Sequence, residues 1–198
     1  MNVEESRAWF IFGSLALILL VATPTLGLFV RLPDVSDKFS EFWLLGPGRK
    51  AGNYPFNIVV NEIYQVYACV ENHLGYSAYY RVLVKFRNQS QPLPVGSNST
   101  RSPLPAIYEF NIFVRDGGVA EKLLRFEIID VICSDTIMTV NKMSINEATP
   151  TINGSATWNA EGNGFFYQFF FELWLYNATV QRHDYNNRFV GFWVNITA

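Results

Sequence analysis

Most of the chain consists of short runs rich in Val, Ile, Phe, Tyr and Trp, separated by clusters of Gly, Pro, Asn, Asp and Ser. β-Branched and aromatic residues favour strands, whereas the separating residues favour turns. No long window keeps the 3.6-residue apolar period of an amphipathic helix. The runs are residues 57–70, 76–87, 106–115, 122–133, 136–143, 165–176 and 188–197. About seven or eight strands at this spacing predict a mainly β domain, an immunoglobulin-like β-sandwich.

Two segments of this domain carry further expectations. Residues 165–176 (FFYQFFFELWLY) are apolar on both faces, which indicates either a central strand covered on both sides or a partner interface. Residues 89–105 are rich in proline and longer than an ordinary hairpin loop, and we expect them to form an exposed, glycosylated excursion.

The N-terminal region holds an uncharged run over residues 8–30, which Arg7 and Arg31 flank. As a helix it would be about 35 Å long, enough to cross a hydrocarbon core of roughly 30 Å. We predict a cytoplasmic tail over residues 1–7, a single transmembrane helix over 8–30, a connector over 31–38 and an extracytoplasmic head over 39–198. A cleaved signal peptide is the alternative, but apolar residues that continue beyond Pro24 favour the uncleaved anchor.

Composition narrows the class of partner. The net charge is −2 and only 16% of the residues are charged, so the chain has no basic surplus with which to neutralise phosphates. Nucleic acid is therefore not expected as a partner. We expect a lipid bilayer and one or more integral membrane proteins instead.

Sequons of the Asn-x-Ser/Thr type favour exposure of the head on the outer side of a cell membrane. They are more frequent than the composition alone would give, and we expect N-linked glycans on them because glycans fit loops. The sequons begin at Asn88, Asn98, Asn153, Asn177 and Asn195.

The two cysteines, Cys69 and Cys133, lie in runs that predict strands. In an oxidising compartment we expect them to pair, which in the chain-entropy model stabilises the fold by up to about 4 kcal/mol. Two free buried thiols are the alternative. Two cysteines and two widely separated histidines make a poor zinc set, and we predict no metal site.

Catalytic chemistry has little support in the sequence. His183 and Asp184 are adjacent, so on an extended segment their side chains point apart, and no Gly-x-Ser-x-Gly elbow supplies a serine. We predict that the protein is not an enzyme and uses no cofactor. Two other classes remain: an accessory or scaffolding subunit of a larger membrane complex, or a surface-layer, adhesion or pilus-like filament subunit that assembles through its N-terminal segment.

Three segments of the head carry a family motif. The first begins at Phe39 as FSEFWLLGPGRKAGNYP, the second is Asn72-His73, and the third is the C-terminal strand over residues 192–197. Together they resemble the archaeal membrane-protein family catalogued as domain of unknown function 1616. The matching residues of the first two segments are Phe39, Ser40, Glu41, Phe42, Trp43, Leu45, Gly46, Pro47, Ala51, Tyr54, Pro55, Asn72 and His73.

The resemblance implies an archaeal, outward-facing β-sandwich on a membrane anchor, and it implies no activity. Two departures are Leu74, where the family often has Glu, and one predicted transmembrane helix where many members have several. From the residues themselves we expect structural roles. The aromatic residues of the first motif would cover one end of the sandwich as an apolar plug, and Glu41 would bind turn N–H groups.

Overall fold

The computed structural model describes residue 7, residues 9–19 and residues 38–197. The chain divides into two units, Met1–Asp37 and Lys38–Ala198. In the first unit, residues 9–19 are helical. Within the described part of the chain, no helix combines the length and the apolar character that crossing a membrane requires. Most of the predicted transmembrane helix (residues 8 and 20–30) lies outside the described residues, as do residues 1–6 of the predicted tail and residues 31–37 of the connector.

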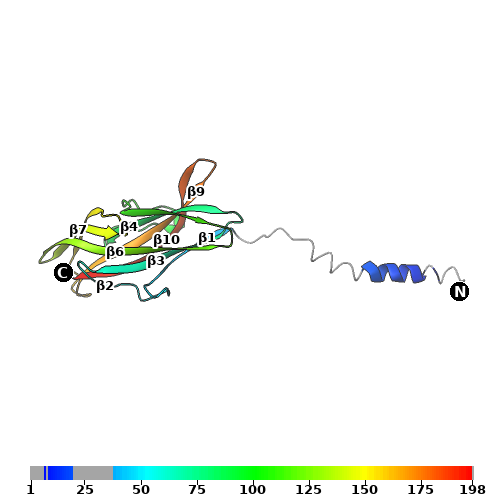
Figure 1. Ribbon diagram of the computed structural model, residues 1–198, viewed down its shortest axis with the longest axis horizontal. Helices are drawn as coiled ribbons and strands as arrows, with labels where there is room; N and C mark the ends of the chain where they lie inside the picture. Colours follow the sequence, from blue (N-terminus) through cyan, green and yellow to red (C-terminus); the bar gives the residue numbers. More distant parts are fainter. Residues whose placement is uncertain (1–6, 8, 20–37, 198) are drawn as a thin grey trace. The chain divides into compact units, whose positions relative to one another are not determined.

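The second unit, called the head here, is a two-layer β structure (Figure 1). One sheet has the order β1-β3-β6-β7-β8 and the other has the order β2-β10-β9-β4-β5. The strands are β1 (Phe39–Leu45), β2 (Asn57–Val59), β3 (Ile63–His73), β4 (Ala78–Asn88), β5 (Tyr108–Val114), β6 (Val119–Ser134), β7 (Ile137–Ile145), β8 (Thr151–Thr157), β9 (Phe165–Asn177) and β10 (Arg182–Thr197). The prediction of a mainly β sandwich is confirmed.

The strand order has an immunoglobulin-like centre. In immunoglobulin domains strands A, B and E share one sheet and strands C, F and G share the other. Here β1, β3 and β6 lie together, and β4, β9 and β10 lie together. The hairpin of β7 and β8 extends the first sheet beyond β6, where an immunoglobulin domain has strand D.

The core between the sheets comes from the period-2 alternation of the long strands. Phe126 of β6, Phe169 of β9 and Phe192 of β10 are all nearly fully buried. The ring centroids of Phe126 and Phe169 are 4.6 Å apart, and those of Phe169 and Phe192 are 5.5 Å apart. Aromatic contacts across the layers therefore join the central strands of both sheets.

The predicted run over residues 57–70 is two strands. Asn61 has a positive φ of 66° and the Glu62 N–H donates to the Val59 carbonyl, so the chain turns between β2 and β3. β2 then pairs in parallel with β10, whereas β3 lies in the other sheet. A turn-forming asparagine inside an otherwise apolar run was the available signal.

Two strands were not predicted. β1 occupies the segment expected to be an apolar plug, and it alternates as a strand, with Phe42 and Leu44 buried and Phe39 and Glu41 exposed. Aromatic residues on its outer face hide that alternation in the sequence. β8 lies between the predicted runs over residues 136–143 and 165–176, in a stretch that contains the sequon at Asn153.

The apolar segment of β9 is a central strand covered on both faces. Of the two alternatives that the sequence left open, the structure therefore has the covered strand and not an exposed partner interface. Phe169 and Phe171 face the core, while Phe170 and Glu172 on the other face are also fully buried. β4 and β10 flank the strand.

The cover on the outer face of β9 comes from residues 89–107, which join β4 to β5 and include the proline-rich residues 89–105; we call this segment the strap. Most of its residues are exposed, as expected of an excursion, but Ser102 is 1% exposed and anchors the segment to the sheet. The Ser102 N–H donates to Glu172 Oε1 at 2.8 Å, and Lys85 Nζ donates to the Ser102 carbonyl at 2.9 Å. Arg101 lies over the ring of Trp174, 5.5 Å from its centroid. The part of the strap around Asn98 is exposed.

Candidate metal centre

The antiparallel pairing of β1 with β3 brings the first two segments of the family motif together. Phe39 lies opposite His73, Ser40 opposite Asn72 and Glu41 opposite Glu71. Alternate residues of a strand face opposite sides of the sheet. Glu41, Glu71 and His73 therefore share the outer face.

The donor atoms of these three side chains converge. One ligand atom from each of Glu41, Glu71 and His73 lies within 4.8 Å of the other two. His73 Nε2 is 3.0 Å from Glu71 Oε1. The Phe39 ring stacks on the imidazole with centroids 4.7 Å apart, which restricts the orientation of the ring. Glu41 is exposed, and Glu71 and His73 are partly buried.

This arrangement is suited to a divalent cation. Two carboxylates directly opposite on adjacent strands repel each other, and a cation between them removes that repulsion. Imidazole and carboxylate groups together suit zinc, manganese and iron. Three protein ligands leave coordination positions open for water or for a group from another molecule.

The expectation that Glu41 binds turn N–H groups is wrong. Glu41 does not lie in a turn; it lies within β1 and opposite Glu71. Glu71 was missed altogether. Its only signal is its register with Glu41, which no pattern within one segment reveals. Glu41 belongs to the first motif segment, and Glu71 directly precedes the second. No single stretch of sequence therefore contains the cluster, and the sequence predicted no metal site.

Beneath the cluster, Asn72 faces the interior and is fully buried. Its Nδ2 donates to the carbonyls of Tyr76 at 2.8 Å and Val114 at 3.0 Å. Its Oδ1 accepts from the Leu74 N–H and from the Tyr80 hydroxyl, each at 3.1 Å. The side chain thus joins β3, the following turn, β4 and β5 below the candidate site.

The turn after β1 explains further motif positions. A Cβ on Gly46 would lie 2.2 Å from the Gly52 carbonyl oxygen, so this close approach requires glycine. The Tyr54 hydroxyl donates to the Leu44 carbonyl at 2.9 Å, and its ring stacks on Phe192 at 5.9 Å. Trp43 is partly buried on the outer face, Pro47 is exposed and Pro55 is partly buried.

The predicted disulfide is wrong, because both cysteines are free. Cys69 lies opposite Glu121 of β6, and Cys133 lies near the far end of that same strand. At about 3.3 Å per residue the two are roughly 40 Å apart, whereas a disulfide needs Cα atoms within about 7 Å. Cys69 is buried, and this burial raises the pKa of its thiol to about 11, with a further contribution from Glu121. Cys133 is exposed.

The sequons differ in accessibility. Asn98, Asn153 and Asn177 are exposed, although Asn153 lies in β8 and not in a loop. Asn88 is partly buried and donates from Nδ2 to the Ser155 carbonyl at 2.7 Å.

Asn195 does not fit a glycan. It is 7% exposed, and its Oδ1 accepts from the Phe165 N–H at 3.1 Å. Its Nδ2, to which a glycan would be attached, donates to Asn57 Oδ1 at 3.4 Å. The expectation of a glycan at Asn195 is therefore inconsistent with this fold.

His183 and Asp184 face opposite sides of β10. The His183 ring packs on Tyr79 and Tyr176, while the Asp184 carboxylate accepts from Asn177 Nδ2 and Arg182 Nε. Burial, followed by the charge of Arg81, lowers the pKa of His183. The two side chains do not share a site.

Comparisons with known proteins place the chain in a family but give it no activity. A family model described as "Domain of unknown function (DUF1616)" matches residues 33–131. No curated protein matches the sequence.

Two solved structures are among those that resemble the chain. One is a β-glucosidase from Listeria innocua in complex with glucose, with 8% identity and a TM-score of 0.38, over 81% of this chain and 16% of the glucosidase chain. The other is a CARDB domain from Pyrococcus furiosus in complex with di-metal ions, with 8% identity and a TM-score of 0.40, over 85% and 100% of the two chains. The chain thus spans less than a fifth of the glucosidase. Likenesses this distant carry no conclusion about function.

Proposed function

The chain belongs to the family described as domain of unknown function DUF1616, and because that description carries no activity, we propose its function from its own residues. We propose that it is a non-catalytic, single-pass, N-glycosylated membrane protein. Its head acts as an accessory or scaffolding subunit of a larger membrane complex on the outer face of an archaeal cell membrane.

The observation that carries the proposal is the apolar surface of the helix over residues 9–19. Successive residues of a helix point about 100° apart, and Trp9, Phe10, Ile11 and Phe12 are 66–80% exposed in the described structure. Leu15, Leu17 and Ile18 are 55–64% exposed. A helix that is apolar all round belongs inside a protein or a membrane. The uncharged run over residues 8–30 supports the same conclusion.

Extraction of native membranes tests this function. We expect the full-length protein to resist carbonate, to need detergent for release, and to migrate after mild solubilisation with a stoichiometric membrane-protein partner. Mass spectrometry should find glycans on some of Asn98, Asn153 and Asn177. Migration as a lone monomer would contradict the subunit proposal. A polymer lacking its N-terminal segment would instead support the filament alternative.

A second function has its own observation. The convergence of Glu41, Glu71 and His73 within 4.8 Å favours binding of a divalent cation at the edge of the first sheet. Such a cation would have a structural role and needs no catalytic one. By joining β1 to β3 it would stabilise the folded state over the unfolded state.

Removal of one ligand checks this second function. We expect His73→Ala and Glu41→Gln each to weaken Zn²⁺ or Mn²⁺ binding by about tenfold or more, since each removes one of three donors. Isothermal titration calorimetry on the full-length protein in detergent measures the effect. Glu109→Gln, which alters an exposed carboxylate on the other sheet, is the matched control and should bind as the unaltered protein does. Equal affinity in all four proteins would refute the site.

A further inference from the structure

Half of β6 lacks a second neighbour. β3 pairs with β6 from Val119 to Glu127, but β7 pairs with it only from Phe126 to Ser134. Within the described residues, the stretch over 119–125 therefore has a strand on one side only. Backbone N–H and C=O groups along such an edge form a template for another extended chain.

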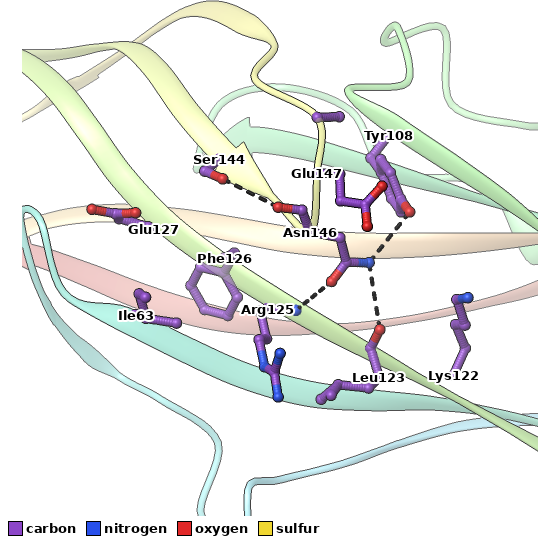
Figure 2. Close-up of a pocket in the computed structure, with 11 residues that line it drawn as sticks. Ile63, Tyr108, Lys122, Leu123, Arg125, Phe126, Glu127, Ser144, Asn146 and Glu147 are labelled. Carbon is purple, nitrogen blue, oxygen red and sulfur yellow. Dashed lines mark hydrogen bonds between the residues drawn. The ribbon is translucent and has the colours of Figure 1, made fainter.

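Asn146 begins to fill the missing position. It follows the last residue of β7 and has a positive φ of 52°. Its N–H donates to the Arg125 carbonyl at 2.8 Å, and its Oδ1 accepts from the Arg125 N–H at 2.9 Å. Its Nδ2 lies 3.5 Å from the Leu123 carbonyl oxygen and 3.3 Å from the Tyr108 hydroxyl (Figure 2).

This bonding shows what the edge accepts. The side-chain amide of Asn146 contacts β6 as a peptide group of an adjoining strand would, with one acceptor and one donor toward the β6 backbone (Figure 2). The Asn146 side-chain amide thus occupies, at one point along β6, the position that a peptide group of a neighbouring strand would take. Toward Val119 the same edge continues without a strand beside it in the described part of the head.

The edge borders a groove of about 710 Å³, within the range of about 300–1,000 Å³ typical of ligand sites. β6 lines one side through Lys122, Leu123 and Arg125, and Glu147 lies across from them (Figure 2). Ala148, in the same turn after β7, also lines the groove. The walls carry charges of both signs. An extended peptide matches this combination, because its backbone would pair with the edge while its side chains meet the charged walls.

We propose that this groove binds an extended peptide segment of a protein partner, which adds a strand beside residues 119–125 of β6. The proposal rests on the accessory-subunit function for the existence of that partner, and it specifies how the head holds it. Main-chain hydrogen bonds supply affinity, and Lys122, Arg125 and Glu147 select the side chains of the segment.

Selection from a phage-displayed library of random heptapeptides against the full-length protein in detergent tests the proposal. Enriched peptides are then synthesised and their affinities measured by fluorescence anisotropy. We expect Ala148→Trp, which fills the groove, to weaken binding by about tenfold or more. Ala160→Trp, which adds the same side chain in an exposed loop, should leave binding unchanged. Peptides N-methylated at alternate residues should also lose about tenfold or more, because they cannot pair with the edge.

Other outcomes would overturn the inference. These are the absence of enriched peptides, equal binding to both tryptophan variants, full affinity of the N-methylated peptides, or a concentration-dependent dimer that Ala148→Trp dissociates. The result is separable from the accessory function. A partner that comigrates in the membrane experiment, combined with no peptide binding here, rejects the groove and keeps the function. Peptide binding by a protein that migrates alone keeps the groove and rejects the accessory-subunit function.

Discussion

Replacing Lys85 by methionine is expected to lower the free energy of unfolding by about 3–5 kcal/mol, because it leaves a buried carboxylate without its cation. Lys85 Nζ lies 2.9 Å from Glu172 Oε2, and the two side chains are 2% and 0% exposed. Burial lowers the pKa of Lys85, and the hydrogen bond and charge of Glu172 oppose that shift. Urea unfolding of the full-length protein measures the change.

Two controls separate the ion pair from lost packing. The double variant Lys85→Met, Glu172→Leu removes both charges and should recover part of the loss, since apolar replacement of a buried pair is often nearly neutral. Recovery is incomplete because the Ser102 N–H then loses its acceptor as well. Arg182→Met removes one partner of the exposed Arg182–Asp184 pair and should change the free energy of unfolding by less than about 1 kcal/mol. A double variant no more stable than the single variant would show that the pair itself is not responsible.

The Lys85–Glu172 pair is a feature that the sequence alone does not predict. The apolar run of β9 indicated either a strand covered on both faces or a partner interface, and in the structure it is a covered strand. The identity of its cover is not predictable, because Glu172 and Lys85 lie far apart in the chain and the strap joins them through the backbone of Ser102. Proline-rich segments usually lie on the surface. Only the buried charges, which need hydrogen-bonding partners, explain why this one folds back.

The candidate metal centre has the same limitation. The motif residues Glu41 and His73 were evident in the sequence, but their meeting depends on the register of β1 with β3. The residue that completes the cluster, Glu71, becomes recognisable only once that register is known. The cysteines illustrate the converse error: two strand-like runs suggested a disulfide, yet both cysteines lie along the paired strands β3 and β6, far apart.

Asn72→Ala is expected to destabilise the head by about 3 kcal/mol or more, since a buried donor or acceptor left without its partner costs about 1–3 kcal/mol. The substitution removes four hydrogen bonds, to Tyr76, Val114, Leu74 and Tyr80. The Tyr80 hydroxyl keeps a second contact, 2.7 Å from Ser40 Oγ, which limits the loss at that group. The free energy of unfolding in urea provides the measurement.

The matched control is Asn111→Ala, which truncates an exposed asparagine of β5 whose Oδ1 accepts one hydrogen bond, from Arg81 at 3.3 Å. We expect that variant to lie within about 0.5 kcal/mol of the unaltered protein. Equal stability of the two variants would mean that Asn72 does not hold β3, β4 and β5 together. A loss confined to Asn72→Ala would assign the Asn-His motif two roles, with Asn72 supporting the sandwich from inside and His73 presenting its imidazole on the surface.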